Sequence, residues 1–217
     1  MGVCSNYLTT IEQDEEIKFE IDRTRMHLPA DPSSAVLFIC TGTGYAPMRG
    51  LIMQRAYLLH RGQKLGPAYI IFGSRSSKEG LFTDEIKMFH QLGALTEVHH
   101  CYSREPGKKK MYATTKLRSA VFLEPFLASE YINQYFKSAH SYHAFHILSH
   151  IFHRQYSPPL QVKNSHIFIC GSANLAEECK AIMKEHTSKE SFDAITKDGR
   201  LHCDVFGAVT PTSQLRK

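Results

Sequence analysis

The sequence predicts an α/β protein built on a doubly wound parallel sheet. Two observations predict this class: short apolar runs of strand length recur along the chain, and segments with helical periodicity separate them. A third observation is that polar or glycine-containing loops follow several of these runs, as they do at the carboxyl ends of parallel strands. The length of 217 residues suits one large α/β domain or two small ones.

The expected elements begin with a strand over 36–40, where the run Val-Leu-Phe-Ile-Cys is apolar throughout and has the length of a buried strand. A helix is expected to follow it to about residue 60, because the sequence places at helical spacing Met48, Leu51, Ile52, Arg55 and Leu59. The later elements are strands over 69–72, 95–101 and 167–170 and helices over 82–92 and 175–186. Over 17–21, apolar and charged residues alternate, which predicts a further, half-exposed strand.

Composition argues against several classes of protein. No apolar run is long enough to span a bilayer, and the acidic residues over 12–16 are incompatible with a secretion signal. None of the six cysteines belongs to a C-x-x-C pair, so neither a zinc ribbon nor a redox dithiol motif is expected. A reduced, cytoplasmic setting is therefore expected, and membrane anchoring by a segment outside this sequence stays open.

The turn after the first expected strand is a candidate pyrophosphate site. The tetrapeptide Thr-Gly-Thr-Gly at 41–44 leaves little side chain in the way, and Pro47 suits the first turn of a helix. The free N–H groups of a helix start attract an anion, and the helix dipole adds to this attraction. Because Pro47 stands at the third glycine position of the dinucleotide fingerprint, an ordinary structural turn is the alternative.

Basic residues follow two other expected strands. Arg75 comes after the second strand and Arg104 after the third, with lysines at 108–110 close behind. Ligands of open α/β sheets bind at the carboxyl ends of the strands, so these cations and the glycine turn are expected to surround one crevice. Such a cluster suits a polyanion, and an added phosphate is what separates NADP from NAD. Taken alone, the lysine run favours a solvated surface.

Seven segments resemble the C-terminal NADPH-binding half of the diflavin reductases, which resemble ferredoxin–NADP reductase fused to a flavodoxin. In chain order the segments are GVCSNYL at 2–8, CTGTGYAPMRG at 40–50, FGSR at 72–75, LFTDEI at 81–86, CYSREPGKKKMY at 101–112, FICGSANLAEE at 168–178 and RLHCDVFG at 200–207. The family includes microsomal cytochrome reductase, sulfite reductase flavoprotein and the reductase part of nitric oxide synthase. The SREP segment with its lysines and the terminal DVFG resemble the nitric oxide synthase branch.

The resemblance implies a ferredoxin–NADP reductase-like domain that binds NADPH and passes its hydride to FAD. It assigns the NADPH pyrophosphate to Thr41, Gly42, Thr43, Gly44, Pro47 and Arg75, and the adenosine 2′-phosphate to Ser103, Arg104, Lys110 and Tyr112. It assigns the FAD pyrophosphate to Gly2, Val3, Cys4 and Ser5. At positions 114 and 172, threonine and serine stand where the family often has glutamine and aspartate, so the contacts made there are expected to differ.

The same resemblance places the hydride-transfer chemistry near the end of the chain. Cys170 and its neighbour Gly171 would lie beside the nicotinamide. Asp204 would stabilise charge as the hydride moves, and Phe206 would stack on the flavin ring. Without the resemblance, the alternatives are a buried core thiol, an exposed turn aspartate and a core phenylalanine.

Two regions follow from these assignments. Residues 1–30 are expected to be the remnant of an FAD-binding domain with a linker strand, and residues 31–217 the NADP-binding domain. Because the remaining FAD-domain and FMN-domain motifs are missing, the chain is expected to be an excised or truncated portion that holds FAD poorly. A helical insertion is expected at about 117–165, with histidines at 140, 143, 146, 150 and 153 on one face. A solvated polar face, a pH-dependent docking surface and a metal site are the interpretations considered.

The sequence therefore predicts the NADPH-binding portion of a flavin-dependent oxidoreductase. Electrons would pass from NADPH to FAD, then through FMN to a haem protein or other acceptor, as in nitric oxide synthase or cytochrome reductase. Flavin domains of the same polypeptide are the other expected partners. A catalytically silent NADP-binding regulatory module is the alternative. Nucleic acid is not an expected partner, because the net charge is only +5 and the basic residues cluster at one loop.

Overall fold

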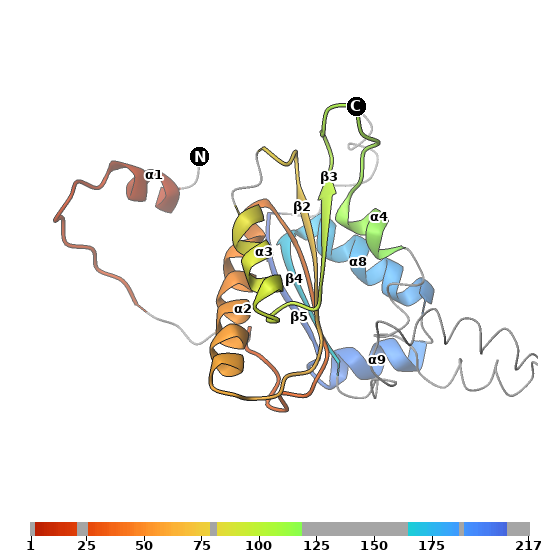
Figure 1. Ribbon diagram of the computed structural model, residues 1–217. Coiled ribbons are helices and arrows are strands. Elements are labelled where there is room, and N and C mark those ends of the chain that lie inside the picture. Colours follow the sequence, from red (N-terminus) through yellow and green to blue (C-terminus); the bar gives the residue numbers. More distant parts are fainter. Residues whose placement is uncertain (1–2, 21–25, 79–81, 119–164, 187–188, 208–217) are drawn as a thin grey trace, which may run out of the picture.

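A parallel five-stranded sheet forms the centre of the described chain (Figure 1). The computed structural model describes residues 3–20, 26–78, 82–118, 165–186 and 189–207. Its strands are β1 (Val36–Thr41), β2 (Ala68–Ser74), β3 (Glu97–Tyr102), β4 (His166–Ser172) and β5 (Leu201–Phe206). They lie in the order β3-β2-β1-β4-β5, and every neighbouring pair is parallel. The chain thus winds outward from β1 in one direction and later in the other, which confirms the predicted doubly wound sheet.

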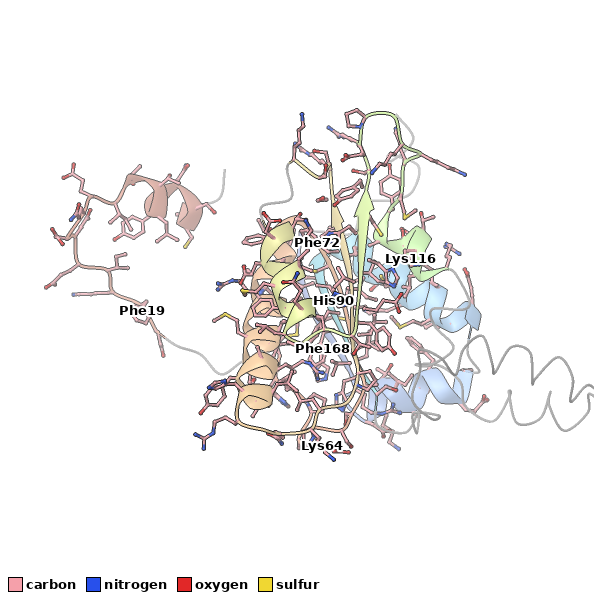
Figure 2. All side chains as sticks on the ribbon, viewed as in Figure 1. Phe19, Lys64, Phe72, His90, Lys116 and Phe168 are labelled. Atoms are coloured by element: carbon pink, nitrogen blue, oxygen red, sulfur yellow. The ribbon has the colours of Figure 1, made fainter. Side chains whose placement is uncertain are left out.

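Helices cover both faces of this sheet (Figure 1). The first face carries α2 (Tyr45–His60) and α3 (Thr83–Gln91), and the second carries α4 (Ala113–Leu117), α8 (Ala173–His186) and α9 (Lys189–Lys197). Each side has its own apolar layer, and Phe72 and Phe168 belong to the layer under α2 (Figure 2). Because a strand turns its side chains alternately to the two faces, β1 serves both layers only by being apolar throughout. Its residues from Val36 to Cys40 are fully buried.

Most of the expected elements are confirmed, with ends that differ by a few residues. The strands β1 to β4 and the helices α2, α3 and α8 lie where the sequence predicts them. The elements β5, α4 and α9 were not expected. β5 forms an edge of the sheet and is exposed from Cys203 to Phe206, so it lacks the continuous apolar run that marks an inner strand.

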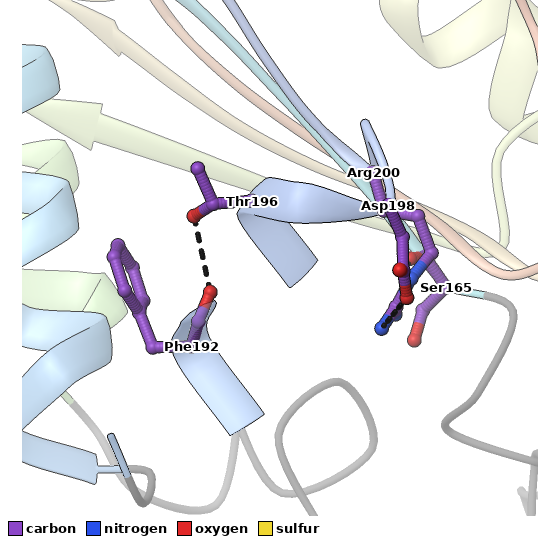
Figure 3. Close-up of polar contacts among 5 residues, drawn as sticks. All are labelled: Ser165, Phe192, Thr196, Asp198 and Arg200. Atoms are coloured by element: carbon purple, nitrogen blue, oxygen red, sulfur yellow. Dashed lines mark hydrogen bonds and ion pairs between the residues drawn. The ribbon is translucent and has the colours of Figure 1, made fainter. Parts of the chain in front are cut away.

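A set of polar contacts fixes the entry into β5 (Figure 3). The Thr196 hydroxyl donates to the Phe192 carbonyl at 3.0 Å within the last turns of α9. Just after the helix, the Arg200 guanidinium donates to the Ser165 carbonyl at 3.3 Å and to the Asp198 carboxylate at 3.4 Å. The contact between Arg200 and Ser165 joins the residues that precede β5 and β4, and the two strands then pair in parallel with Ile167 opposite Leu201.

The N-terminal region differs from the prediction. It begins with a short helix, α1 (Val3–Thr10), that has no buried residue. Residues 15–20 belong to no strand, so the linker strand expected over 17–21 is wrong for its described part, 17–20. Phe19 is 79 % exposed and lies away from the sheet (Figure 2). Alternation alone does not produce a strand, because a strand needs a neighbour to satisfy its backbone N–H and C=O groups.

Candidate functional site

The glycine turn lies at the carboxyl edge of the sheet, at the point where the strand order reverses. It forms a short 3₁₀ turn, η1 (Gly42–Gly44), between β1 and α2. Gly42 has a φ of +53°, a left-handed conformation that glycine adopts readily. A Cβ added to Gly44 would lie 2.3 Å from the Cys170 carbonyl oxygen, so the turn sits directly against the end of β4. Ligands of doubly wound sheets bind at this switch point.

The start of α2 fits a bound phosphate. Gly44 is the N-cap of α2 and makes no side-chain hydrogen bond, so the cap residue does not satisfy the free N–H groups of the first turn. Pro47 lies in the first turn, where its missing N–H removes no helical hydrogen bond. A Cβ on Gly42 would meet nothing within 4 Å, and Thr43 is exposed, so the outer side of the turn is open. These residues therefore fit the pyrophosphate of a dinucleotide.

The structure brings the two predicted arginines to the same edge. The loops after β2 and β3 continue side by side beyond the strands: the Ser103 N–H donates to the Ser74 carbonyl at 3.1 Å, and the Arg104 N–H donates to the Arg75 carbonyl at 2.7 Å. Both arginines are exposed. Within the described part of the chain, the Arg104 guanidinium forms no ion pair. Two guanidinium groups therefore lie on adjoining loops, an arrangement that suits a phosphate.

A further contact between these two loops was not predicted. The N–H of Ser77 donates to one oxygen of the Glu105 carboxylate at 2.6 Å, and its hydroxyl donates to the other oxygen at 2.8 Å. These hydrogen bonds, with smaller contributions from the Lys108 and Lys78 charges, lower the pKa of Glu105 below its ordinary value. The two residues are 28 positions apart, so only the pairing of β2 with β3 places them together.

The basic loop returns to the sheet before α4. The Met111 N–H donates to the Tyr102 carbonyl at 2.9 Å, which brings the flanking Lys110 and Tyr112 next to the end of β3. Both flanking residues are exposed, with Tyr112 at 54 %. The predicted 2′-phosphate residues are thus on one side of the carboxyl edge, over β2 and β3, while the glycine turn lies over β1 and β4.

Cys170 and Asp204 are neighbours at this edge. They face each other in the register of β4 and β5, and Cys170 also faces Cys40 of β1. Cys170 is only 3 % exposed, and this burial, with a further effect of the Asp204 carboxylate, raises the pKa of its thiol to about 11. The Cys170 thiol is therefore protonated at neutral pH and is not a nucleophile. It belongs to the apolar layer under α2, so the alternative of a buried core thiol agrees with the structure.

Asp204 and Phe206 lie on β5 with exposed side chains. Asp204 belongs to a strand, so the alternative of a turn aspartate is wrong. Phe206 is 51 % exposed, so the alternative of a core phenylalanine is wrong as well. An exposed aromatic ring at the end of an edge strand is available to cover a planar ligand.

The last two residues of β4, Gly171 and Ser172, position this edge. A Cβ on Gly171 would lie 2.8 Å from the Thr41 hydroxyl oxygen, so glycine permits the close approach of β1 and β4 here. The Ser172 hydroxyl accepts the N–H of Leu175 at 3.2 Å and so caps the start of α8. The serine that replaces the family's usual aspartate thus has a structural role, which its place before a helical segment signals in the sequence.

The segment expected to bind FAD is not part of this edge. Val3, Cys4 and Ser5 belong to the exposed helix α1, and Gly2 lies outside the described residues. The histidine-rich segment at 140–153 also lies outside them. Among the described residues, no group of three histidine, cysteine or acidic side chains is placed to hold a metal ion. No helix of the described ranges combines the length and the apolarity needed to cross a membrane.

A doubly wound sheet with a glycine turn, an uncapped helix start and cationic loops at its switch point defines a dinucleotide-binding α/β domain. Comparison with protein families agrees with this class. Residues 38–181 match the oxidoreductase NAD-binding domain, and the chain belongs to that family. The match extends from β1 into α8 and includes the glycine turn and both basic loops.

Nearly the whole chain is also similar to inducible nitric oxide synthases. It is 29 % identical to the Homo sapiens protein over 223 residues, which cover 97 % of this chain and 17 % of that protein. The Rattus norvegicus protein is 27 % identical over 96 % of this chain and 17 % of its own length. The Oryctolagus cuniculus protein is 26 % identical over 95 % of this chain and 37 % of its own length. The chain therefore spans only a minor part of the length of these relatives. Their similarity over nearly the whole chain confirms the resemblance drawn from the motifs.

Proposed function

We propose that this chain is the NADPH-binding portion of a flavin-dependent oxidoreductase of the nitric oxide synthase or cytochrome reductase type. One observation carries the proposal: three features meet at a single sheet edge. They are the uncapped start of α2, the arginines of two adjoining loops, and the paired Cys170 and Asp204. NADPH has a pyrophosphate, an additional phosphate on its adenosine ribose and a nicotinamide ring, so it would use all three.

The anionic half of the coenzyme is held by backbone and cationic groups. The N–H groups between Gly42 and the first turn of α2 bind the pyrophosphate, and Arg75 supplies charge beside it. Arg104 and the Ser103 hydroxyl bind the 2′-phosphate, with Lys110 and Tyr112 completing that end. A planar guanidinium gives a phosphate two parallel hydrogen bonds, which accounts for a preference for the phosphorylated coenzyme.

The nicotinamide end is served by Cys170 and Asp204. NADPH supplies a hydride from C4 of its ring, and the ring becomes positively charged as the hydride leaves. The carboxylate of Asp204, exposed beside Cys170, stabilises this developing charge. The thiol of Cys170 stays neutral at pH 7 because its pKa is about 11, so it contacts the ring without attacking it.

In this proposal the hydride acceptor is FAD, and the electrons continue through FMN to a haem protein or another acceptor. The exposed ring of Phe206 would cover the flavin, and Val3, Cys4 and Ser5 would contribute to its pyrophosphate site. Flavin domains of the same polypeptide would supply the remaining contacts.

A catalytically silent NADP-binding module is a second candidate, favoured by the position of α1, none of whose residues is buried. The two candidates differ in one activity. NADPH-dependent reduction of cytochrome c or ferricyanide by the full-length gene product supports the oxidoreductase. Binding of NADPH without any such reduction supports the silent module.

Calorimetric titration of this chain with NADP⁺ and NAD⁺ tests the coenzyme site. We expect NADP⁺ to bind at least about tenfold more tightly, since a charge-assisted hydrogen bond contributes about 1.5–3 kcal/mol. Arg104→Ala should remove most of this preference. The matched control is Arg61→Ala, which removes an exposed arginine that follows α2 and should leave it unchanged. Equal affinity for both coenzymes in the unaltered chain would contradict the proposal.

A further inference from the structure

Glu105 is an acidic residue within a cationic loop. It directly follows Arg104, and the charges of Lys108 and Lys78 both act on its carboxylate. A carboxylate accepts the same paired N–H groups of a guanidinium that a phosphate accepts. An unrestrained Glu105 would therefore compete with a bound phosphate for Arg104.

In the structure, hydrogen bonds from Ser77 keep the Glu105 carboxylate from competing for Arg104. Ser77 satisfies both oxygens of Glu105, one through its N–H at 2.6 Å and the other through its hydroxyl at 2.8 Å. The contact also ties the loop after β2 to the loop after β3, just beyond the hydrogen bond from Arg104 to the Arg75 carbonyl at 2.7 Å. The Ser77–Glu105 pair thus engages a carboxylate that would otherwise compete for Arg104, and it fixes the spacing of the two loops that carry the arginines.

We propose that Ser77 and Glu105 are positioning residues that set the preference for a dinucleotide bearing an extra phosphate over the same dinucleotide without it. This inference rests on the proposed function and deepens it. It differs from a contribution to folding alone, because an altered pair should change the affinity for NADP⁺ and leave the affinity for NAD⁺ almost unchanged. The pair has no direct contact with either coenzyme in this account.

Two substitutions separate the effect of the hydrogen bonds from the effect of net charge. Ser77→Ala removes the hydroxyl donor and leaves the charges of the loop as they are. Glu105→Asp keeps the negative charge but shortens the side chain, so it no longer reaches both donors of Ser77. Each change should weaken NADP⁺ binding about three- to fivefold, a modest factor because Ser77 is exposed and Glu105 is only half-buried. The binding of NAD⁺ should change less than about twofold in the same variants.

Two further variants provide the controls. Ser77→Thr keeps both the N–H and a hydroxyl, so it should retain the preference for NADP⁺. In a Glu105→Gln background, where no carboxylate competes for Arg104, Ser77→Ala should have little additional effect. Calorimetric titration with NADP⁺ and NAD⁺ measures every variant, and circular dichroism confirms that each remains folded.

The outcomes distinguish this inference from the proposed function. Loss of NADP⁺ affinity in Ser77→Ala and Glu105→Asp, with NAD⁺ affinity kept, supports the inference. Variants that keep the unaltered preference overturn the inference and leave the proposed function standing. Equal weakening of both coenzymes also overturns it, because the pair then acts on the fold alone. If the unaltered chain shows no preference, both the inference and the proposed function fail.

Discussion

The contact between the glycine turn and the end of β4 predicts a large effect for one added methyl group. In Gly44→Ala, the new Cβ would lie 2.3 Å from the Cys170 carbonyl oxygen and 2.7 Å from its carbonyl carbon. Both are backbone atoms of the sheet, so no side chain can rotate away to make room. The backbone conformation of Gly44 is helical, with a φ of −60°, and alanine adopts it without strain. The predicted effect is therefore purely steric.

The magnitude follows from the cost of overpacking. An extra methyl group in a tightly packed position lowers the free energy of unfolding by about 1–3 kcal/mol. Gly50→Ala is the matched control, because Gly50 lies within α2 and an added Cβ meets nothing within 4 Å. Replacing an exposed helical glycine by alanine raises the free energy of unfolding by about 0.5–1 kcal/mol. The free energies of unfolding of the two variants should thus differ by about 1.5–4 kcal/mol, one lying below and the other above that of the unaltered chain.

Urea denaturation followed by circular dichroism measures both variants under the same conditions. Gly44→Ala should shift the midpoint down and Gly50→Ala should shift it up. Gly44→Ala should also weaken NADP⁺ binding, because the turn must move away from β4. If Gly44→Ala is as stable as Gly50→Ala, the turn is not seated against β4 as described.

Three further predictions concern the same edge and the opposite end of β4. Ser172→Ala removes the cap of α8 and should lower the free energy of unfolding by about 0.5–2 kcal/mol; an unchanged urea midpoint would contradict the capping role. Asp204→Asn should lower the pKa of Cys170 from about 11 toward, but not below, 9.0, because burial is the larger cause. The pH dependence of Cys170 alkylation, followed by mass spectrometry, measures that pKa, and an identical profile would refute the coupling. His166 is hydrogen-bonded to His202 at 3.0 Å, and burial, followed by the charges of His202, Arg200 and His27, lowers its pKa to about 4. Between pH 6.5 and 4, the folded state then binds fewer protons than the unfolded state. Lowering the pH from 6.5 to 4 should therefore lower the free energy of unfolding by about 1–2 kcal/mol, a value reduced because the His166 ring is only half-buried. His166→Asn should flatten this slope, and a slope equal to that of the unaltered chain would count against the assignment.

The sequence predicts the inner part of this fold well, because burial on both faces leaves a strong signal. The run at 36–40 can be apolar throughout only if both sides of the strand are covered, and β1 is covered on both sides. The edge strand β5 has no such signal, since it carries His202, Cys203 and Asp204 and is exposed along most of its length. The alternation at 17–21 predicts a strand that the described residues do not form, because periodicity records side chains and not the presence of a neighbouring strand.

The candidate site, like the fold, can be predicted from the sequence only in part. The positions of Arg75 and Arg104 at one edge follow from the order of strands and loops, because parallel strands end on the same side of the sheet. The neighbouring positions of Cys170 and Asp204 depend on the register of β4 and β5, which the motifs alone do not specify. The Ser77–Glu105 contact depends on loop geometry between residues far apart in the chain, and no local pattern indicates it.

In the proposed function, the carboxyl edge around the switch point binds the phosphorylated dinucleotide. NMR amide chemical shifts of the ¹⁵N-labelled chain, recorded during titration with NADP⁺, locate the binding surface residue by residue. We expect the largest changes at the glycine turn and the first turn of α2, in the loops that carry Arg75 and Arg104, and at Gly171. Changes confined to the amino ends of the strands, around His166 and His202, would contradict it.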